Sequence, residues 1–211
     1  MKGVLGIKRG MTQVFGDKGI VMPVTVVEAG PCVVVQVKTK EVDGYSAIVV
    51  GFQDKRKGIV NKPDAGQFKK AGVAPKRYLR EFKVEEGTYK VGDEFKCDIF
   101  TEGEYVDVTA KTKGRGFEGV VTRWNHGEGP ASHGSGHHRG VGSTGANSDP
   151  SRVFPGKHMP GHLGHEQVTI QNLQVIKVDI DKNAILVKGG IPGPDGALVT
   201  IKSAVKGGKS A

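Results

Sequence analysis

The chain has 211 residues, 31 Lys and Arg against 22 Asp and Glu, and a formal net charge of +9 at pH 7. This length fits one domain or two small ones, and the basic excess favours a polyanionic partner. No apolar run approaches the roughly 18 residues of a membrane span, and the N-terminal stretch lacks the apolar core of a signal peptide.

The first part of the chain predicts strands and one helix. Ile20–Gly30 and Pro31–Lys40 are rich in β-branched residues and are separated by a Gly-Pro step, and Gly44–Gln53 follows an Asp-Gly turn. Asn61–Gly72 predicts a short helix, because Pro63 stands near its start, lysines in its last turn and a glycine at its end.

Alternating patterns continue towards the C-terminus. They predict strands at Lys76–Val84, Asp93–Phe100 and Glu104–Lys113. Alternation returns at Glu166–Gly190, which predicts a hairpin around an Asp-Lys-Asn turn, and Gly196–Val205 predicts the closing strand. The expected fold is mainly β, an antiparallel β-barrel with one short helix and a long irregular glycine-rich extension.

The expected division follows from these patterns. Residues 1–112 and 166–205 form the barrel body, with the short helix inserted near 62–72. Residues 113–165 form an extended loop, and 206–211 a flexible basic tail. Cys32 and Cys97 are expected to be buried free thiols in a reducing cytoplasm.

The segment from Thr122 to His165 contains all seven histidines and the only tryptophan, and has almost no apolar run. On a helix His158 and His162 would share one face, but a Pro-Gly pair lies between them and no cysteine is near. A metal site is therefore disfavoured, and no cofactor is expected.

Two stretches of this region fit the G-x-G-x-x-G pattern of dinucleotide-binding loops, Gly114–Gly119 and Gly140–Gly145. That fold needs a helix running on to a parallel strand, whereas the candidate helix here ends by Asn125. Serines near the histidines lack the strained elbow and the buried carboxylate that acyl transfer needs. A metal- or nucleotide-dependent hydrolase using the histidine cluster is kept as the alternative.

RNA binding accounts better for this segment. Glycines allow the backbone to approach phosphate and ribose, while Arg and His can bind phosphates and Trp124 can stack on a base. A basic segment that folds against RNA needs no core of its own. The residues expected to contact RNA are Lys113, Arg115, Arg123, Trp124, His126, His133, His137, His138, Arg139, Arg152, Lys157, His158 and His162.

Four stretches carry a family signature: MKGVLGIKRGMTQVF at the start, KGRGFEGVVTRW at Lys113–Trp124, ASHGSGHHRGVGSTG at Ala131–Gly145 and VFPGKHMPGHLG at Val153–Gly164. EQVTIQNLQVIKVD follows where the barrel pattern resumes. In this order they resemble the universal family of large-subunit ribosomal protein L3, in its bacterial form.

The resemblance implies a β-barrel body of the translation-protein type and an extension that penetrates the large-subunit rRNA towards the peptidyl transferase centre. It also implies direct binding near the 3′ end of that rRNA, nucleation of subunit assembly, and neighbouring large-subunit ribosomal proteins as partners. By position, the tip of the extension falls around Gly142–Arg152 with Asn147 at the family's tip asparagine, and Trp124 corresponds to the family's tryptophan finger.

One departure concerns a modification. Many bacterial members carry glutamines on both sides of the tip asparagine, and one of these is methylated. Ala146 and Ser148 stand at these positions, so the modification cannot occur here. The sequence thus predicts a structural rRNA-binding protein of the cytoplasmic ribosome that is not an enzyme and has no membrane contact and no small-molecule substrate.

Overall fold

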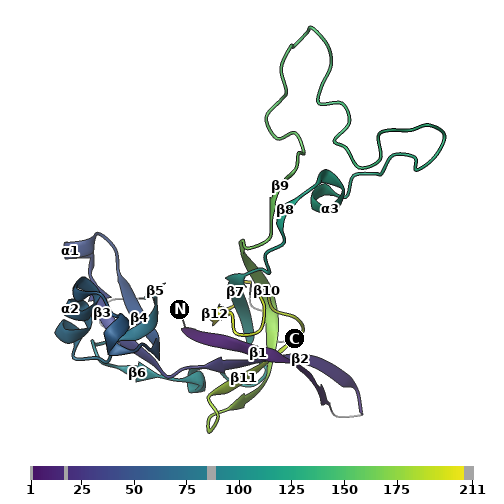
Figure 1. Cartoon of the computed structure of the whole chain (residues 1–211). Coiled ribbons are helices and arrows are strands. Elements are labelled where there is room, and N and C mark those ends of the chain that lie inside the picture. The colour runs from purple at the N-terminus through teal and green to yellow at the C-terminus, as the bar shows by residue number, and fades with distance from the viewer. Residues whose placement is uncertain (1, 17–18, 85–88, 207–211) are drawn as a thin grey trace. The chain divides into compact units, whose positions relative to one another are not determined.

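A computed structural model describes residues 2–16, 19–84 and 89–206, and these residues form three antiparallel sheets (Figure 1). The mainly β prediction is confirmed. The chain divides into two compact units, Met1–Lys111 with Gln167–Ala211, and Thr112–Glu166, hereafter the extension. The predicted tail lies almost wholly outside the described residues. No described helix is both long enough and apolar enough to cross a membrane.

The first sheet is a six-stranded closed barrel in the order β1-β12-β7-β10-β11-β2. Closure joins distant parts of the sequence, because β1 pairs with both β2 and β12. The hairpin predicted after the extension is confirmed as β10 and β11. Alternate side chains of each strand fill the barrel, as in β7, where Val106, Val108 and Ala110 are buried. The strands are β1 (Gly3–Phe15), β2 (Val21–Ala29), β7 (Tyr105–Lys111), β10 (Gln167–Asp179), β11 (Ala184–Lys188) and β12 (Leu198–Ser203).

The remaining strands of the first unit were expected to belong to the barrel, but they form a second sheet in the order β5-β4-β3-β6. The expectation was wrong because a period of two marks a strand without telling which sheet it joins. One buried cluster continues through both sheets, and the Cys32 thiol donates to the carbonyl of Leu5 at 3.5 Å. The strands are β3 (Cys32–Lys38), β4 (Ala47–Asp54), β5 (Lys76–Lys83) and β6 (Glu94–Phe95).

The predicted helix is present as α2 (Lys62–Ala71) and ends at Gly72, whose φ of 67° is left-handed. It is not the only helix. A short α1 (Lys40–Asp43) replaces the predicted turn before β4, and α3 (Val120–Trp124) lies in the extension. Two 3₁₀ turns, η1 (Lys57–Ile59) and η2 (Cys97–Ile99), complete the elements of the first unit.

Among the described residues of the first unit, two charged side chains are buried, Lys8 and Asp107, and the sequence did not indicate either. The Lys8 ammonium donates to two backbone carbonyls of the 189–196 loop, at 2.9 and 3.1 Å. The Asp107 carboxylate accepts the N–H groups of Asn172, at 3.0 Å, and Val205, at 3.2 Å. Both residues therefore fasten irregular backbone to the barrel.

Both cysteines are free and buried, as the sequence predicted. Burial raises the pKa of the Cys32 thiol to about 12. The pKa of Cys97 is raised as well, first by burial and then by the charge of Asp98. Neither thiol is therefore ionised to a useful extent near neutral pH.

Candidate nucleic-acid interface

The extension begins and ends in a short two-stranded stem. β8 (Gly116–Glu118) pairs antiparallel with β9 (Gly161–Leu163). Below this pair the Thr112 N–H donates to the carbonyl of Glu166 at 2.9 Å. The G-x-G-x-x-G stretch therefore lies partly in a three-residue strand of an antiparallel pair, which excludes the parallel βαβ unit of a dinucleotide fold at this point.

The stem depends on a close approach of two backbones. Gly164 has a φ of 77°, and a Cβ there would lie 2.1 Å from the Lys113 carbonyl oxygen. The next residue, His165, donates its N–H to the same oxygen at 3.4 Å. A residue with a side chain cannot occupy position 164 without displacing the opposite strand.

Beside the stem, α3 carries a cluster of aromatic and basic side chains. The Arg123 guanidinium and the Trp124 indole N–H both donate to the Met159 carbonyl, at 2.9 and 3.1 Å. The Trp124 and His158 rings are stacked, with centroids 4.1 Å apart and planes 1° from parallel. His126 Nε2 lies 3.4 Å from His158 Nδ1. We call Arg123, Trp124, His126 and His158 the tryptophan cluster.

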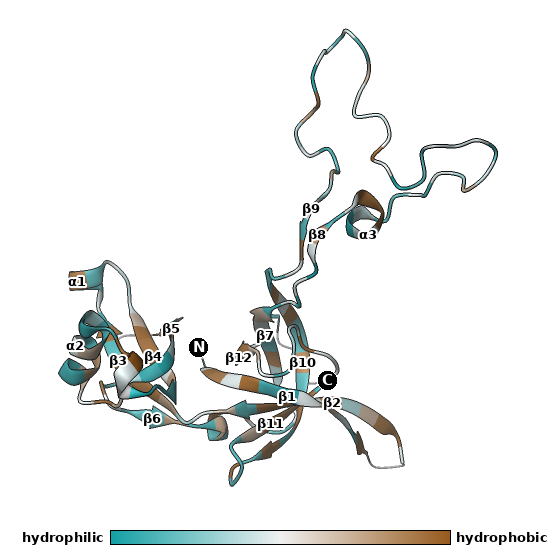
Figure 2. Ribbon diagram, viewed as in Figure 1, coloured by the Kyte–Doolittle hydropathy of each residue, from teal (hydrophilic) through white to brown (hydrophobic). Residues whose placement is uncertain are grey.

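This cluster is ordered and yet open to solvent. Trp124 is 40% exposed, although its indole N–H is hydrogen-bonded to Met159 and its ring is stacked on His158. Nearby Phe117 on β8 is 79% exposed. Val120 is the one buried apolar side chain in Thr112–Glu166, all of which the structure describes. The extension therefore has almost no core of its own (Figure 2).

The loop that follows α3 is held by backbone contacts of its histidines. The Gly129 N–H donates to the His138 carbonyl at 2.8 Å, and His138 Nδ1 donates to the Pro130 carbonyl at 2.8 Å. A Cβ at Gly129 would lie 1.9 Å from the His137 carbonyl oxygen. Arg139 forms an ion pair with Glu128. His137 and His138 therefore act partly as a scaffold for the loop.

The second loop contains the expected tip. Asn147 and Pro150 form an isolated bridge, and the Ser143 hydroxyl donates to the Gly145 carbonyl at 2.8 Å. The Arg152 guanidinium lies 5.2 Å from the centre of the Phe154 ring, which is 56% exposed. The tip is thus formed by short-range contacts with exposed side chains.

The expected contact residues do not converge on one point. Arg123, Trp124, His126 and His158 meet in the tryptophan cluster, whereas Lys113, Arg115 and His162 lie along the stem. The others, all exposed, are distributed over the two loops: His133, His137, His138, Arg139, Asn147, Arg152 and Lys157. Among the described residues, which include every histidine, no group of three metal-ligating side chains occurs. The hydrolase hypothesis therefore lacks a ligand set.

The charge of the extension is modest. It contains six Lys and Arg and four acids. Arg139 is paired with Glu128, but no described carboxylate lies within ion-pair distance of the other five cations, Lys113, Arg115, Arg123, Arg152 and Lys157. These five charges are available to a partner.

A family comparison adds to this geometry. Residues 83–184 match the family model of ribosomal protein L3. This part of the chain is similar to the ribosomal protein L3 family. The matched range contains β7, the complete extension and β10, so it covers the segment described above and the barrel strands on each side of it. A member of this family is a non-enzymatic structural protein of the large ribosomal subunit and takes part in translation.

One feature of the extension could not be inferred from side-chain types. The acceptor that fixes Arg123 and Trp124 is the backbone carbonyl of Met159, and any residue type could supply it. Phe117 and Phe154 are exposed enough to stack on bases, and their position in a polar, glycine-rich segment was an available signal.

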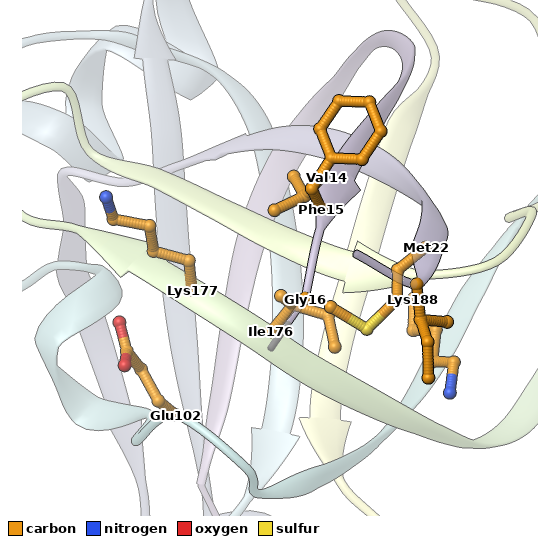
Figure 3. A pocket seen from close by; sticks show the side chains of 9 residues that line it. Val14, Phe15, Gly16, Met22, Glu102, Ile176, Lys177 and Lys188 are labelled. Carbon is orange, nitrogen blue, oxygen red and sulfur yellow. The ribbon is translucent and has the colours of Figure 1, made fainter. Parts of the chain in front are cut away.

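The barrel also bears an open groove of 680 Å³ (Figure 3). Phe15 lies at its rim and is 65% exposed. The described lining contains no histidine, so the groove is separate from the histidines of the hydrolase hypothesis. The lining residues are Val14, Phe15, Gly16, Ile20, Met22, Glu102, Ile176, Lys177 and Lys188.

Proposed function

We propose that the chain binds large-subunit rRNA directly through the extension. The observation that carries this proposal is the tryptophan cluster, a set of fixed but exposed aromatic and basic side chains on a unit with one buried apolar residue. Such a unit gains little from burying its own surface, whereas stacking a base on an exposed ring contributes about 1–3 kcal/mol. RNA supplies both the bases on which these rings can stack and the phosphates that the basic side chains can bind.

The barrel body and the extension have different proposed roles, and the two parts follow the boundaries expected from the sequence. The barrel body, 1–112 and 166–205, fixes the position of the protein, and the segment 113–165 runs between rRNA helices. We propose that the tip, Gly142–Arg152 with Asn147, reaches towards the peptidyl transferase centre. The four family motifs of the sequence support this reading, together with binding near the 3′ end of the rRNA, nucleation of subunit assembly and a bacterial form of the protein.

The extension would bind by several kinds of contact. Lys113, Arg115 and Lys157 would neutralise phosphates, and the exposed rings of Trp124 and Phe154 would stack on unpaired bases. Glycines such as Gly142, which has open space around the Cβ position, would let RNA approach the backbone. These contacts position the protein without any chemical step.

The test compares the full chain with a deletion of Trp124–Gly156. Binding to deproteinised large-subunit rRNA is measured by filter retention at 150 mM KCl. The deletion is expected to leave a folded, monomeric barrel with a cooperative melt and to weaken binding at least tenfold, which corresponds to about 1.4 kcal/mol. Equal affinity of the two proteins would contradict the proposal, and loss of the cooperative melt would contradict the domain division.

A further inference from the structure

The basic excess of the chain lies mainly outside the extension. The segment Lys55–Arg77 contains eight Lys and Arg and one acid, Asp64, which is an excess of seven out of the net charge of +9. The extension, Thr112–Glu166, contributes an excess of only two. The part of the chain best suited to attract a polyanion by charge is therefore in the first unit.

Lys55–Arg77 is one continuous piece of structure, hereafter the basic segment. It leaves the end of β4, forms η1 and α2, and enters β5 (Figure 1). Its two ends lie side by side, because Asp54 pairs with Lys76 and the Lys55 N–H donates to the Pro75 carbonyl at 2.8 Å. Charges from both ends of the segment are thus gathered at one end of the four-stranded sheet.

Few of these charges are compensated within the protein. Lys76, whose side chain is 12% exposed, is paired with Asp54 at 2.8 Å. Among the described residues, no carboxylate lies within ion-pair distance of Lys55, Arg56, Lys62, Lys69, Lys70 or Arg77. Elsewhere in the first unit Arg9 and Lys38 have acidic partners. Clustered like charges destabilise a compact state, so a cluster without acidic partners favours the binding of an external anion.

Helix-dipole and edge-strand effects explain only some of the basic residues of this segment. Lys69 and Lys70 stand in the last turn of α2, where cations interact favourably with the helix dipole. A basic edge strand such as β5 also resists pairing with another sheet. Lys62, however, is the first residue of α2, where a cation is unfavourable, and Lys55 and Arg56 belong to neither element.

We propose that the basic segment is a second rRNA-binding surface, separate from the extension, that contacts the phosphate backbone. This proposal rests on the proposed function, because it names a further contact with the same RNA. Protein–protein interfaces are depleted in lysine, whereas lysine binds phosphate as a point charge without demanding geometry. α2 presents a hydrophilic surface (Figure 2), which fits contact with a sugar–phosphate backbone better than contact with unpaired bases.

The test uses the full chain and two variants of equal net charge. The first carries Lys62→Gln, Lys69→Gln and Lys70→Gln in the basic segment. The matched control carries Lys96→Gln, Lys182→Gln and Lys188→Gln, which are exposed lysines of the same unit outside the segment. Glutamine keeps the helix propensity of lysine, and a urea melt of each variant verifies that it is folded.

Binding to deproteinised large-subunit rRNA is measured from 100 to 400 mM KCl. Removing one lysine–phosphate interaction reduces the slope of log K against log [KCl] by about 0.7–0.9. The slope of the basic-segment variant is expected to fall by about two, and that of the control by less than about one half. Equal slopes for the two variants would overturn the second surface.

The outcomes also separate this proposal from the proposed function. If the basic-segment variant keeps the wild-type slope while the Trp124–Gly156 deletion loses affinity, rRNA binding stands and the second surface is refuted. If the wild-type chain does not bind rRNA, both proposals are refuted. The basic-segment variant could also fail to associate with the large subunit while its slope for free rRNA stays at the wild-type value. The segment would then bind an acidic protein surface, which also contradicts the proposal.

Discussion

Replacing Gly164 by alanine is expected to open the stem of the extension while the barrel stays folded. The new Cβ would lie 2.1 Å from the Lys113 carbonyl oxygen and 3.1 Å from the Gly114 Cα, and both are backbone atoms that cannot turn aside. The φ of 77° adds a conformational cost for alanine of about 1–2 kcal/mol. Displacing the strand also weakens the bond from the Arg115 N–H to the Leu163 carbonyl, which contributes about 1 kcal/mol.

The expected local destabilisation is about 2–3 kcal/mol, the sum of these costs. Native-state hydrogen exchange at the Arg115 amide reports it directly, and a change of this size reduces protection by about 30- to 150-fold. Gly116→Ala is the matched control in the same stem. Gly116 has a φ of 76° but nothing within 4 Å of the Cβ position, so only the conformational cost applies.

The two variants together test the close approach at Gly164. Gly116→Ala is expected to reduce protection of the stem about tenfold, clearly less than Gly164→Ala. The urea midpoint of the barrel should be unchanged in both. Equal protection in the two variants would refute the close approach, and a large fall in the barrel midpoint would show that the stem and the barrel unfold together.

Further predictions concern three single residues. Trp124→Phe removes the indole donor to Met159 but retains an aromatic ring, so we expect local stability of the tryptophan cluster to fall by about 1 kcal/mol, measured by hydrogen exchange. Lys8→Met removes two bonds from a buried ammonium to the 189–196 loop and is expected to cost about 2–3 kcal/mol of unfolding free energy in urea; a change below about 0.5 would contradict that role. Because burial raises the pKa of Cys32 to about 12, alkylation at pH 8 should be at least about a hundredfold slower than in the unfolded chain, and comparable rates would contradict its burial.

Local sequence patterns were sufficient to predict most elements of the first unit. The short helix at Lys62–Ala71 was recognisable from its proline, lysines and terminal glycine, and the β10–β11 hairpin from alternation on both sides of a polar turn. The division between barrel and second sheet was not recognisable. β4 is a continuous apolar run and β7 alternates, yet neither pattern identifies the sheet that the strand joins, because strand partners are fixed by contacts between distant residues.

The candidate site was predictable in its residue types but not in its geometry. A glycine-rich stretch with scattered cations and histidines indicates RNA binding, yet nothing local predicts that Trp124 stacks on His158 or that Arg123 and Trp124 share the Met159 carbonyl. The three-residue strands of the stem are too short for a periodic signal. The basic charge of Lys55–Arg77 is present in the sequence. It stands out only when Lys and Arg are compared with Asp and Glu segment by segment.

The central claim, an rRNA-embedded extension, is tested most directly by sedimenting cell lysate through a high-salt sucrose gradient and counting copies of this chain per large subunit. The account predicts about one copy per subunit that stays bound after the salt wash, because an extension between RNA helices is held by stacking and backbone contacts as well as by screened charges. Release of the chain to the top of the gradient would contradict it.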